Sequence, residues 1–374
     1  MRPHFVVLGA GRTGAFIARK LAGLGERVTL VDRSESALER ATGLAALTAR
    51  AANLADQDAL AQAVADADVV VGALPGGIGF EVLHSVIAAG KSMVDISFFP
   101  EDPFRLDEQA KARGVRAVVD CGVMPGLGGM LAAHLAGLLD EPESLAIYVG
   151  GLPVERTWPL EYHAPFSPSD VIEEYVRPAR LKRCGTVIDL PALSEVEQVH
   201  VLSVGTLEAF LTDGLRTLLR TLPFPNMVEK TLRYPGHAEK MRMLRELGFF
   251  SLLPTRIGEH EVRPRDMAVR LLEQAWQGQA WREFTYLRVV AEGTSKGERQ
   301  IYEASGLNWT EDDDSSMSRC TGWPAVMAAR MLSAGELDAL GPGIIPAEAI
   351  GADPRLMRLM LAGLASAGLG FVAP

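Results

Sequence analysis

Short apolar runs alternate with longer amphipathic stretches through the first third of the chain. The apolar runs predict strands at His4–Leu8, Arg27–Val31, Leu44–Thr48, Asp68–Leu74, Ser92–Asp95 and Val115–Val119. The amphipathic stretches predict helices at Thr13–Leu24, Ser34–Thr42, Asp56–Ala65, Phe80–Ala89 and Arg105–Arg113. Strands and helices that alternate in this way form a parallel sheet covered on both faces. We therefore expect an α/β domain with a doubly wound parallel sheet of strand order 3-2-1-4-5-6.

The pattern changes after Asp120. A turn-rich segment leads into an apolar helix that runs to Leu139, and later strand-like segments are longer and alternate apolar with polar residues: Leu145–Val149, Val199–Val204, Trp281–Glu292 and Arg299–Ala304. Alternation of this kind is typical of an antiparallel sheet with one face open to solvent or helices. Helices are expected again at Arg265–Trp276, Ala325–Leu332 and Pro354–Leu364. We expect residues 1–122, completed by 322–374, to form one domain, and residues 123–321 to form a second, α+β domain on a mostly antiparallel sheet.

A glycine pattern joins the first expected strand to the first expected helix. Gly9, Gly11 and Gly14 have the GxGxxG spacing of a dinucleotide-binding loop, and Arg12 and Thr13 lie between them. Gly9 permits the tight turn, Gly11 lets a pyrophosphate approach bare backbone, and Gly14 lets helix and strand pack closely. The first domain is therefore expected to be a Rossmann-type domain whose helix N-terminus binds the phosphates.

Asp32 lies at the end of the second strand, where a carboxylate accepts hydrogen bonds from the ribose hydroxyls and repels a 2′-phosphate. This favours NAD, although the neighbouring Arg33 would suit NADP. Leu74 and Pro75 end the fourth strand at the crevice where ligands bind in such sheets, so their backbone is expected to line the cofactor groove.

Several motifs outside the glycine loop resemble the saccharopine dehydrogenase (reductase) superfamily. They are DCGVMPG at 120–126, YVGGLP at 148–153 and RYPGH at 233–237, and further matching stretches lie at 159–162, 193–197, 207–210, 236–240, 262–266 and 321–324. Within the superfamily the chain is most similar to the L-lysine 6-dehydrogenases, which oxidatively deaminate the lysine ε-amine with NAD. The resemblance covers nearly the whole chain. It also implies a homodimer, for which the exposed face of the inserted sheet is a natural surface.

The chain departs from the saccharopine reductases at three positions. Those enzymes resemble this chain but carry Asp where it has Met124, Cys where it has Val149, and Tyr where Phe98 is the counterpart. None of the three replacements can exchange a proton. The departures argue against saccharopine chemistry, and the lysine 6-dehydrogenases share the first of them.

Amine oxidation needs a group that accepts the ammonium proton. Asp95 and Asp120 end the fifth and sixth strands and are expected at the crevice, where either could hold or deprotonate an ammonium; capping a loop is the alternative for both. His237 follows a Pro-Gly turn, and we take it as the candidate proton acceptor, with helix capping as its alternative role.

An amino-acid substrate also brings a carboxylate. Arg216 is the first candidate for a two-pronged carboxylate contact, Arg233 is its rival, and Asp213 is a further substrate-binding candidate. A surface salt bridge is the alternative role for Arg216. Cys121 is expected to be a buried small residue, because hydride transfer needs no nucleophile.

Composition narrows the possible partners. The 374 residues include 37 basic and 47 acidic side chains, a net charge of −10, which argues against nucleic acid or an anionic membrane as partner. With 48% hydrophobic and 22% charged residues, the chain has the composition of a folded protein. The N-terminal apolar run is too short for a secretion signal, and no run is long enough to span a membrane. The three cysteines are widely spaced, so we expect no disulfide framework, no metal site and a cytoplasmic location.

Three functions fit these observations. The first is NAD-dependent oxidation of the ε-amine of L-lysine, or of a related amino acid or amine, to a semialdehyde that cyclises. The second is reductive amine condensation, as in saccharopine reductases and carboxynorspermidine synthases. The third is a non-catalytic NAD-binding regulatory protein. The crevice carboxylates and His237 favour an enzyme, and the motifs of the second domain favour oxidation of a small amine.

Overall fold

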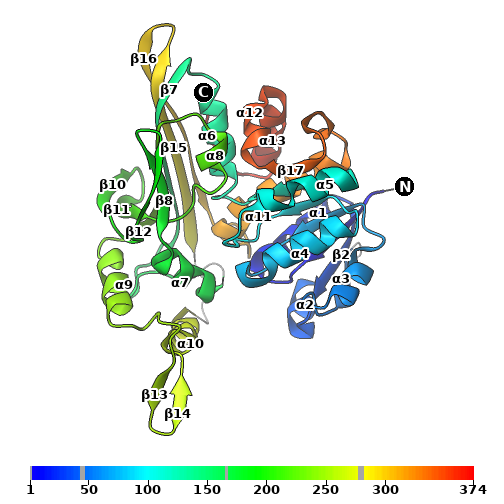
Figure 1. Cartoon of the computed structure of the whole chain (residues 1–374), viewed down its shortest axis with the longest axis horizontal. Coiled ribbons are helices and arrows are strands. Elements are labelled where there is room, and N and C mark those ends of the chain that lie inside the picture. The colour runs from blue at the N-terminus through cyan, green and yellow to red at the C-terminus, as the bar shows by residue number, and fades with distance from the viewer. Residues whose placement is uncertain (1, 43–46, 165–166, 277–281) are drawn as a thin grey trace. The chain divides into compact units, whose positions relative to one another are not determined.

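The computed structural model of the protein describes residues 2–42, 47–164, 167–276 and 282–374. The chain forms two compact units (Figure 1). The first contains residues 1–138 and 318–373, and the second contains residues 139–317.

The first unit is built on a seven-stranded parallel sheet. Its strands, in order across the sheet, are β17 (Gly343–Pro346), β6 (Arg116–Val119), β5 (Met93–Asp95), β4 (Val69–Gly72), β1 (His4–Leu8), β2 (Arg27–Asp32) and β3 (Leu47–Ala51). This order confirms the doubly wound sheet expected from the sequence and adds β17, which pairs in parallel with β6. The strand expected at Leu44–Thr48 corresponds to β3, and residues 44–46 lie outside the described residues.

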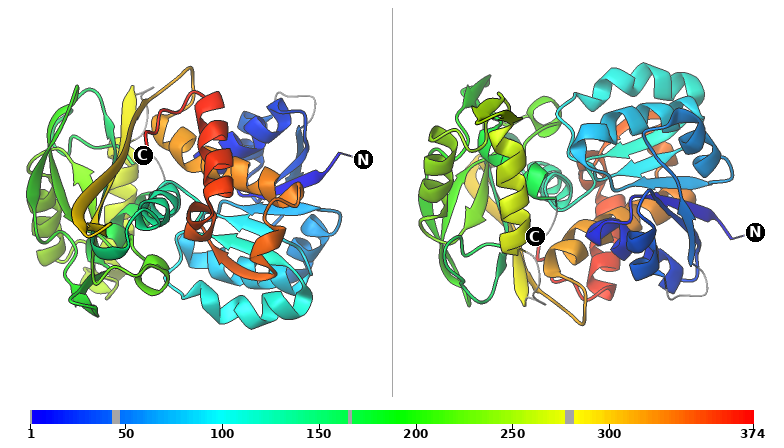
Figure 2. Two further views of the ribbon diagram at one scale, coloured as in Figure 1. Left: turned by 90° about the horizontal axis from the view of Figure 1, so that it is seen from above. Right: turned by 90° about the horizontal axis from the view of Figure 1, so that it is seen from below.

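Helices cover both faces of this sheet (Figure 2). One apolar core combines strand residues with side chains from α3 (Gln57–Val64), α4 (Gly76–Ala88) and α5 (Asp107–Arg113). Outside that core lie α1 (Arg12–Gly23), α2 (Glu35–Ala41) and α11 (Ser316–Ser333). Contact between α1 and α11 is close, because the rings of Phe16 and Trp323 meet edge-on at 6.0 Å.

The buried helix α6 (Leu127–Ala136) also belongs to the first unit. It packs against α12 (Glu348–Ala352), where a Cβ on Gly351 would lie 1.9 Å from the carbonyl oxygen of Met130. The C-terminal helix α13 (Pro354–Ser366) contacts α6 as well. The unit therefore continues past residue 122, where the sequence pattern suggested a boundary, to residue 138.

The second unit is built on a mixed sheet of eight strands. Across the sheet the order is β10 (Glu197–Val201), β11 (Gly205–Leu211), β12 (Asn226–Arg233), β7 (Glu141–Pro153), β15 (Glu283–Ser295) and β16 (Glu298–Trp309), and β8 (Ala179–Arg183) pairs with both β12 and β9 (Thr186–Leu190). Only the pairing of β12 with β7 is parallel among these strands, so the expected mostly antiparallel sheet is confirmed. Trp281, expected at the start of β15, lies outside the described residues.

The helices of the second unit share an apolar core. α7 (Pro168–Val176), α9 (His237–Glu246) and α10 (Pro264–Trp276) contribute Ile172, Met241 and Leu272 to it. The short α8 (Leu218–Thr221) follows β11. Between α9 and α10 the chain forms a two-stranded hairpin of β13 (Thr255–Ile257) and β14 (His260–Val262), which extends beyond α10 (Figure 1).

Candidate functional site

The loop between β1 and α1 presents bare backbone at a helix N-terminus. Gly9 has a φ of 102°, and a Cβ there would lie 2.3 Å from the carbonyl oxygen of Ala73. A Cβ on Gly14 would lie 2.0 Å from the carbonyl oxygen of Gly9, so both positions require glycine. Gly11 is the N-cap residue of α1, makes no side-chain cap hydrogen bond, and has open space where a Cβ would be. Backbone amides at an uncapped helix N-terminus suit a pyrophosphate group.

The remaining cofactor candidates flank this loop. Arg12, which is exposed, and Thr13, which is half-buried, begin α1. Leu74 donates its backbone N–H to Ser97 Oγ at 3.2 Å, and Pro75 is the exposed N-cap residue of α4.

Asp32 ends β2 with its carboxylate fixed by two backbone amides. Its Oδ2 accepts a hydrogen bond from Ala10 N at 2.7 Å, and its Oδ1 accepts one from Ser34 N at 2.8 Å. The adjacent Arg33 is exposed. A negative charge is therefore held rigidly beside the glycine loop.

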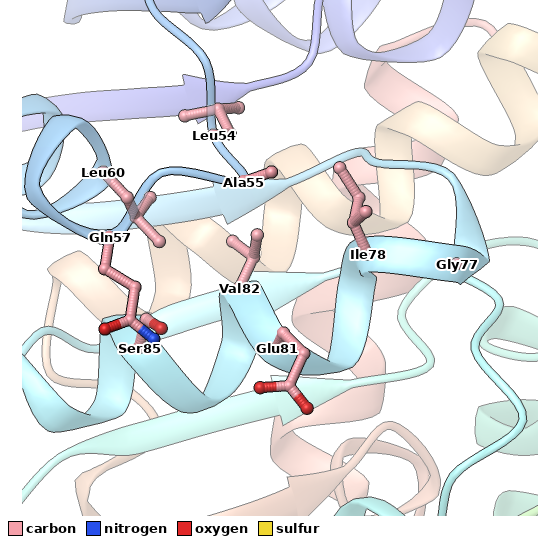
Figure 3. Close-up of a pocket in the computed structure, with 9 residues that line it drawn as sticks. All are labelled: Leu54, Ala55, Gln57, Leu60, Gly77, Ile78, Glu81, Val82 and Ser85. Atoms are coloured by element: carbon pink, nitrogen blue, oxygen red, sulfur yellow. The ribbon is translucent and has the colours of Figure 1, made fainter.

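A cavity of about 240 Å³ lies between α3 and α4 in the first unit (Figure 3). Its lining is apolar toward the middle and polar at Gln57, Glu81 and Ser85, and the apolar residues are Leu54, Ala55, Leu60, Ile78 and Val82. The cavity begins at segments that directly follow β3 and β4. It therefore lies near the carboxyl ends of the strands, where doubly wound sheets bind ligands.

Asp95 ends β5 and Asp120 directly follows the neighbouring strand β6, and both are buried. The Asp95 carboxylate accepts hydrogen bonds from Ser97 Oγ at 2.8 Å and Ser97 N at 3.1 Å. Asp120 has a φ of 55°, a backbone conformation that is uncommon for residues other than glycine. Burial raises the pKa of the Cys121 thiol, and the negative charges of both aspartates raise it further. The fold thus gathers two carboxylates around Cys121, which is itself buried as expected.

His237 is the first residue of α9 and is 1% exposed. Its Nδ1 lies 3.1 Å from the carbonyl oxygen of Leu160, which can only accept, so Nε2 accepts from the Tyr175 hydroxyl at 2.9 Å. Burial, helped by the positive charge of Arg233, lowers the pKa of His237 to about 3. Both ring nitrogens are engaged within the protein and the ring is neutral. This geometry does not favour His237 as a proton acceptor for a substrate.

Arg233 ends β12 in the same aromatic surroundings. Its guanidinium donates to Glu174 Oε2 at 3.1 Å and to the carbonyl oxygen of Leu232 at 2.9 Å, and it lies 4.1 Å from the ring centre of Tyr162. Only 3% of the residue is exposed. Because its charge is balanced by the partly buried carboxylate of Glu174 and by an aromatic face, the geometry does not favour Arg233 as a substrate clamp.

Arg216 and Asp213 are buried in the segment between β11 and α8. Asp213 receives a two-pronged contact from Arg180, with Nε–Oδ1 and Nη2–Oδ2 distances of 2.8 Å. Arg216 is 7% exposed and has a φ of 45°, a strained conformation for a side chain of this size. Burial lowers the pKa of Arg177; Glu173 and Asp213 oppose the shift, and the charges of Arg216 and Arg180 add to it. The positive charges of Arg216 and Arg180 thus both act on Arg177.

The sequence analysis did not identify two further residues of this part of the second unit, Arg177 and Glu229. Arg177 precedes Pro178 in an unremarkable segment, and only the fold places it beside Arg216. Glu229 on β12 is 3% exposed and accepts hydrogen bonds from Thr212 Oγ1 at 2.7 Å and Gly214 N at 3.1 Å. Burial raises the pKa of Glu229 to about 8. No spacing or motif distinguishes either residue, because both acquire their environment from distant segments.

The three positions that depart from the saccharopine reductases carry apolar side chains here. Val149 is buried on β7, Met124 is partly buried before Pro125, and Phe98 is partly buried after β5.

Among residues 2–42, 47–164, 167–276 and 282–374, no group of three or more His, Cys, Asp or Glu side chains could hold a metal ion. Over the same ranges, no helix has both the length and the hydrophobicity needed to cross a bilayer.

Fold and site together define a dinucleotide-binding protein with a second, mixed-sheet unit. Two family models match almost the whole chain: "Saccharopine dehydrogenase NADP binding domain" over residues 5–118 and "Saccharopine dehydrogenase C-terminal domain" over residues 122–369. The protein belongs to the saccharopine dehydrogenase family. The resemblance of its sequence motifs to that family and the expectation of an NAD(P) cofactor are both confirmed.

Curated relatives and a solved structure agree with this assignment. The chain is 26% identical over 238 residues to alpha-aminoadipic semialdehyde synthase of Arabidopsis thaliana, covering 58% of this chain and 22% of that protein. It is 26% identical over 261 residues to saccharopine dehydrogenase [NADP(+), L-glutamate-forming] of Pyricularia oryzae, covering 66% of this chain and 58% of that protein. Apo saccharopine dehydrogenase (L-Glu forming) from Saccharomyces cerevisiae matches with a TM-score of 0.79 at 16% identity, covering all of both chains, which shows the shared fold.

Proposed function

We propose that the protein is an NAD-dependent oxidoreductase that deaminates the ε-amine of L-lysine, or of a closely related amino acid or amine. Family membership and the dinucleotide-binding unit support an oxidoreductase. One observation carries the choice of lysine over saccharopine. Met124, Val149 and Phe98 stand where the saccharopine reductases that the chain resembles carry three ionisable side chains.

Preference for NAD over NADP rests on Asp32. The backbone amides of Ala10 and Ser34 hold both carboxylate oxygens, so the side chain cannot turn away from a 2′-phosphate without losing two hydrogen bonds. Arg33 is exposed, and it is the residue that would pair with the 2′-phosphate of NADP. The cavity between α3 and α4, which has apolar and polar walls, is the space that we assign to the adenine ring of either cofactor (Figure 3).

The reaction removes a hydride from the carbon and a proton from the nitrogen of a neutral amine. A bound nicotinamide ring supplies the hydride acceptor. Water then adds to the substrate imine, and ammonia leaves to give the semialdehyde, which cyclises onto the remaining amine. Asp95 and Asp120 are the carboxylates that we assign to holding the ammonium and accepting its proton, because both lie buried at strand ends. His237 we assign to positioning α9, since its two nitrogens already bond within the protein.

The α-carboxylate of the substrate we assign to Arg216, with Arg177 beside it. Burying a carboxylate without a partner costs several kcal/mol of free energy. A fixed guanidinium group that pairs with the carboxylate offsets a cost of that order. Arg216 is buried and its positive charge acts on the partly exposed Arg177, and the strained backbone of Arg216 is typical of a functional position. Asp213 holds Arg180 and contributes indirectly.

Steady-state assays of reduced cofactor test this proposal. The protein is offered L-lysine, L-saccharopine, L-ornithine and 1,5-diaminopentane, each with NAD and with NADP. We expect reduction of NAD with L-lysine and release of one ammonia per NADH. Reduction with L-saccharopine and not with L-lysine would replace the proposal by saccharopine oxidation. Tight NAD binding without turnover of any substrate would instead indicate a regulatory protein.

A further inference from the structure

Exposed large apolar side chains are concentrated in one segment of the second unit. Eighteen such residues are exposed among the described residues, and eight of them fall between positions 243 and 271. We call these eight the arm surface: Met243, Leu247, Phe249, Leu252, Leu253, Ile257, Met267 and Leu271. The other ten are spread over the rest of the chain. A concentration of this kind marks an interaction site, whereas single exposed apolar residues need no explanation.

Both helices that flank the hairpin carry exposed apolar side chains outside the core of the second unit. One face of α9 and one face of α10 pack into the core of the second unit. Outside that core, Met243 of α9 and Leu247, the residue that follows α9, are 56% and 67% exposed, and Met267 and Leu271 of α10 are 51% and 52% exposed. Each pair is four residues apart, so each forms a continuous stripe along its helix. These side chains do not contribute to the core, and their exposure to water is unfavourable.

The hairpin between the helices, polar over most of its length, adds Ile257 to the arm surface, and Leu253 lies just before it. Every residue of β13 is exposed, and Leu253 and Ile257 are 77% and 63% exposed. An isolated hairpin of two short strands is at best marginally stable in water. The hairpin extends beyond α10 (Figure 1), so little of the second unit supports it. A partner that covers its apolar side would supply the missing stability.

Area and charge together identify the partner. At roughly 150–200 Å² for a fully exposed side chain of this size, the arm surface presents roughly 700–900 Å², close to the 800 Å² that each side of a stable interface buries. Residues 242–273 carry six Arg and five Asp or Glu, a formal charge of +1, in a chain of net charge −10. Two copies can therefore meet here without the repulsion that other faces of this acidic chain would produce.

We propose that the arm surface is the interface through which two copies of this chain form a dimer. The dimer surface expected from the sequence, the open face of the large sheet, has no comparable cluster of exposed apolar side chains among the described residues. Exposed apolar side chains on its strands are single, as for Val187 on β9 and Ile301 on β16. In a two-fold dimer each patch meets its own copy, so an apolar patch with both signs of charge at its margin is self-complementary.

Light scattering coupled to size-exclusion chromatography tests the proposal. The wild-type chain is compared with Leu253→Lys/Ile257→Lys, and the control is Leu202→Lys, which charges a side chain that is 83% exposed outside the arm surface. We expect a dimer mass for the wild type and the control. The double variant should be monomeric, with a dissociation constant raised at least about 100-fold, because each lysine would be buried without a counter-charge.

Folding and membrane binding are checked in parallel. The double variant should keep the wild-type thermal midpoint at low protein concentration and its affinity for NAD, because the substituted side chains are solvent-exposed in the single chain. A monomeric wild type would overturn the proposal, as would a double variant that remains dimeric. Flotation of a monomeric wild type with phosphatidylcholine vesicles would assign the arm surface to a membrane instead.

Discussion

Replacing His237 by Gln tests whether this buried histidine is a neutral structural group. The side chain is 1% exposed, its Nδ1 faces the carbonyl oxygen of Leu160, and its Nε2 accepts from the Tyr175 hydroxyl. Glutamine offers one amide donor and one carbonyl acceptor in a side chain of similar length, and it does not titrate. The variant therefore removes the proton equilibrium and keeps both kinds of hydrogen-bonding group.

The expected effect is a change in how stability depends on pH. Burial lowers the pKa of His237 to about 3, whereas an unfolded histidine titrates near 6.5. Above pH 6.5 neither state holds the proton, so the stability from this group is complete there. As the pH falls below 6.5 only the unfolded chain takes up the proton, and stability is lost until the folded pKa is reached. From these two values the loss is about 2 kcal/mol at pH 5.0.

Urea unfolding followed by tryptophan fluorescence measures this at pH 7.5 and pH 5.0. Between these pH values the wild type should lose about 2 kcal/mol more free energy of unfolding than His237→Gln. His200→Gln, which changes an exposed side chain of the same unit, is the control and should follow the wild type. Equal losses in wild type and His237→Gln would refute the reasoning, as would an imidazole NMR signal of His237 that titrates near pH 6.5. A turnover reduced about 10²-fold or more in the variant would restore His237 as the proton acceptor.

Four further predictions concern the cofactor loop and the second unit. Asp32→Ala should narrow the preference for NAD over NADP at least about tenfold, measured as the ratio of kcat/KM values. Gly14→Ala should abolish NAD binding in fluorescence titrations, because its Cβ would lie 2.0 Å from a backbone oxygen, whereas Gly23→Ala in the same helix meets no atom within 4 Å and should bind normally. Arg216→Gln should raise KM for L-lysine about tenfold or more and leave KM for 1,5-diaminopentane nearly unchanged, and equal increases would remove the carboxylate assignment. Burial raises the pKa of Glu229 to about 8, so its contribution to stability is complete below pH 4.5 and is lost as the pH rises to 8. The free energy of unfolding of Glu229→Gln, measured in urea, should therefore increase relative to that of the wild type across that pH range.

Local patterns were sufficient to predict six of the seven strands in the sheet of the first unit. Buried strands such as β1 and β4 are continuous apolar runs, and the turn residues between them are local as well, so alternation alone yields the parallel sheet. Strand β17 could not be predicted in this way. Its four residues Gly343–Pro346 end in proline, and they form a strand only because β6, more than 200 residues earlier in the chain, provides an edge for pairing.

The same difference between local and distant determinants separates the site residues that could be predicted from those that could not. The glycines of the cofactor loop are predictable, because their spacing over residues 9–14 is a local sequence pattern. His237 illustrates the opposite case. A Pro-Gly turn before a histidine suggests an accessible ring, but Tyr162, Tyr175 and Phe210 come from three separate segments to enclose it. Nothing near position 237 in the sequence encodes that enclosure.

Deuterium transfer from labelled lysine tests the central claim most directly. L-Lysine carrying deuterium at C6, and separately at C2, is incubated with the protein and NAD, and the mass of the reduced cofactor is measured. Our account predicts one deuterium in NADH from the C6-labelled substrate, none from the C2-labelled substrate, and slower turnover with the C6 label only. Deuterium from C2 would show oxidation at the α-amine, and no reduced cofactor from either substrate would contradict the proposed lysine dehydrogenase activity.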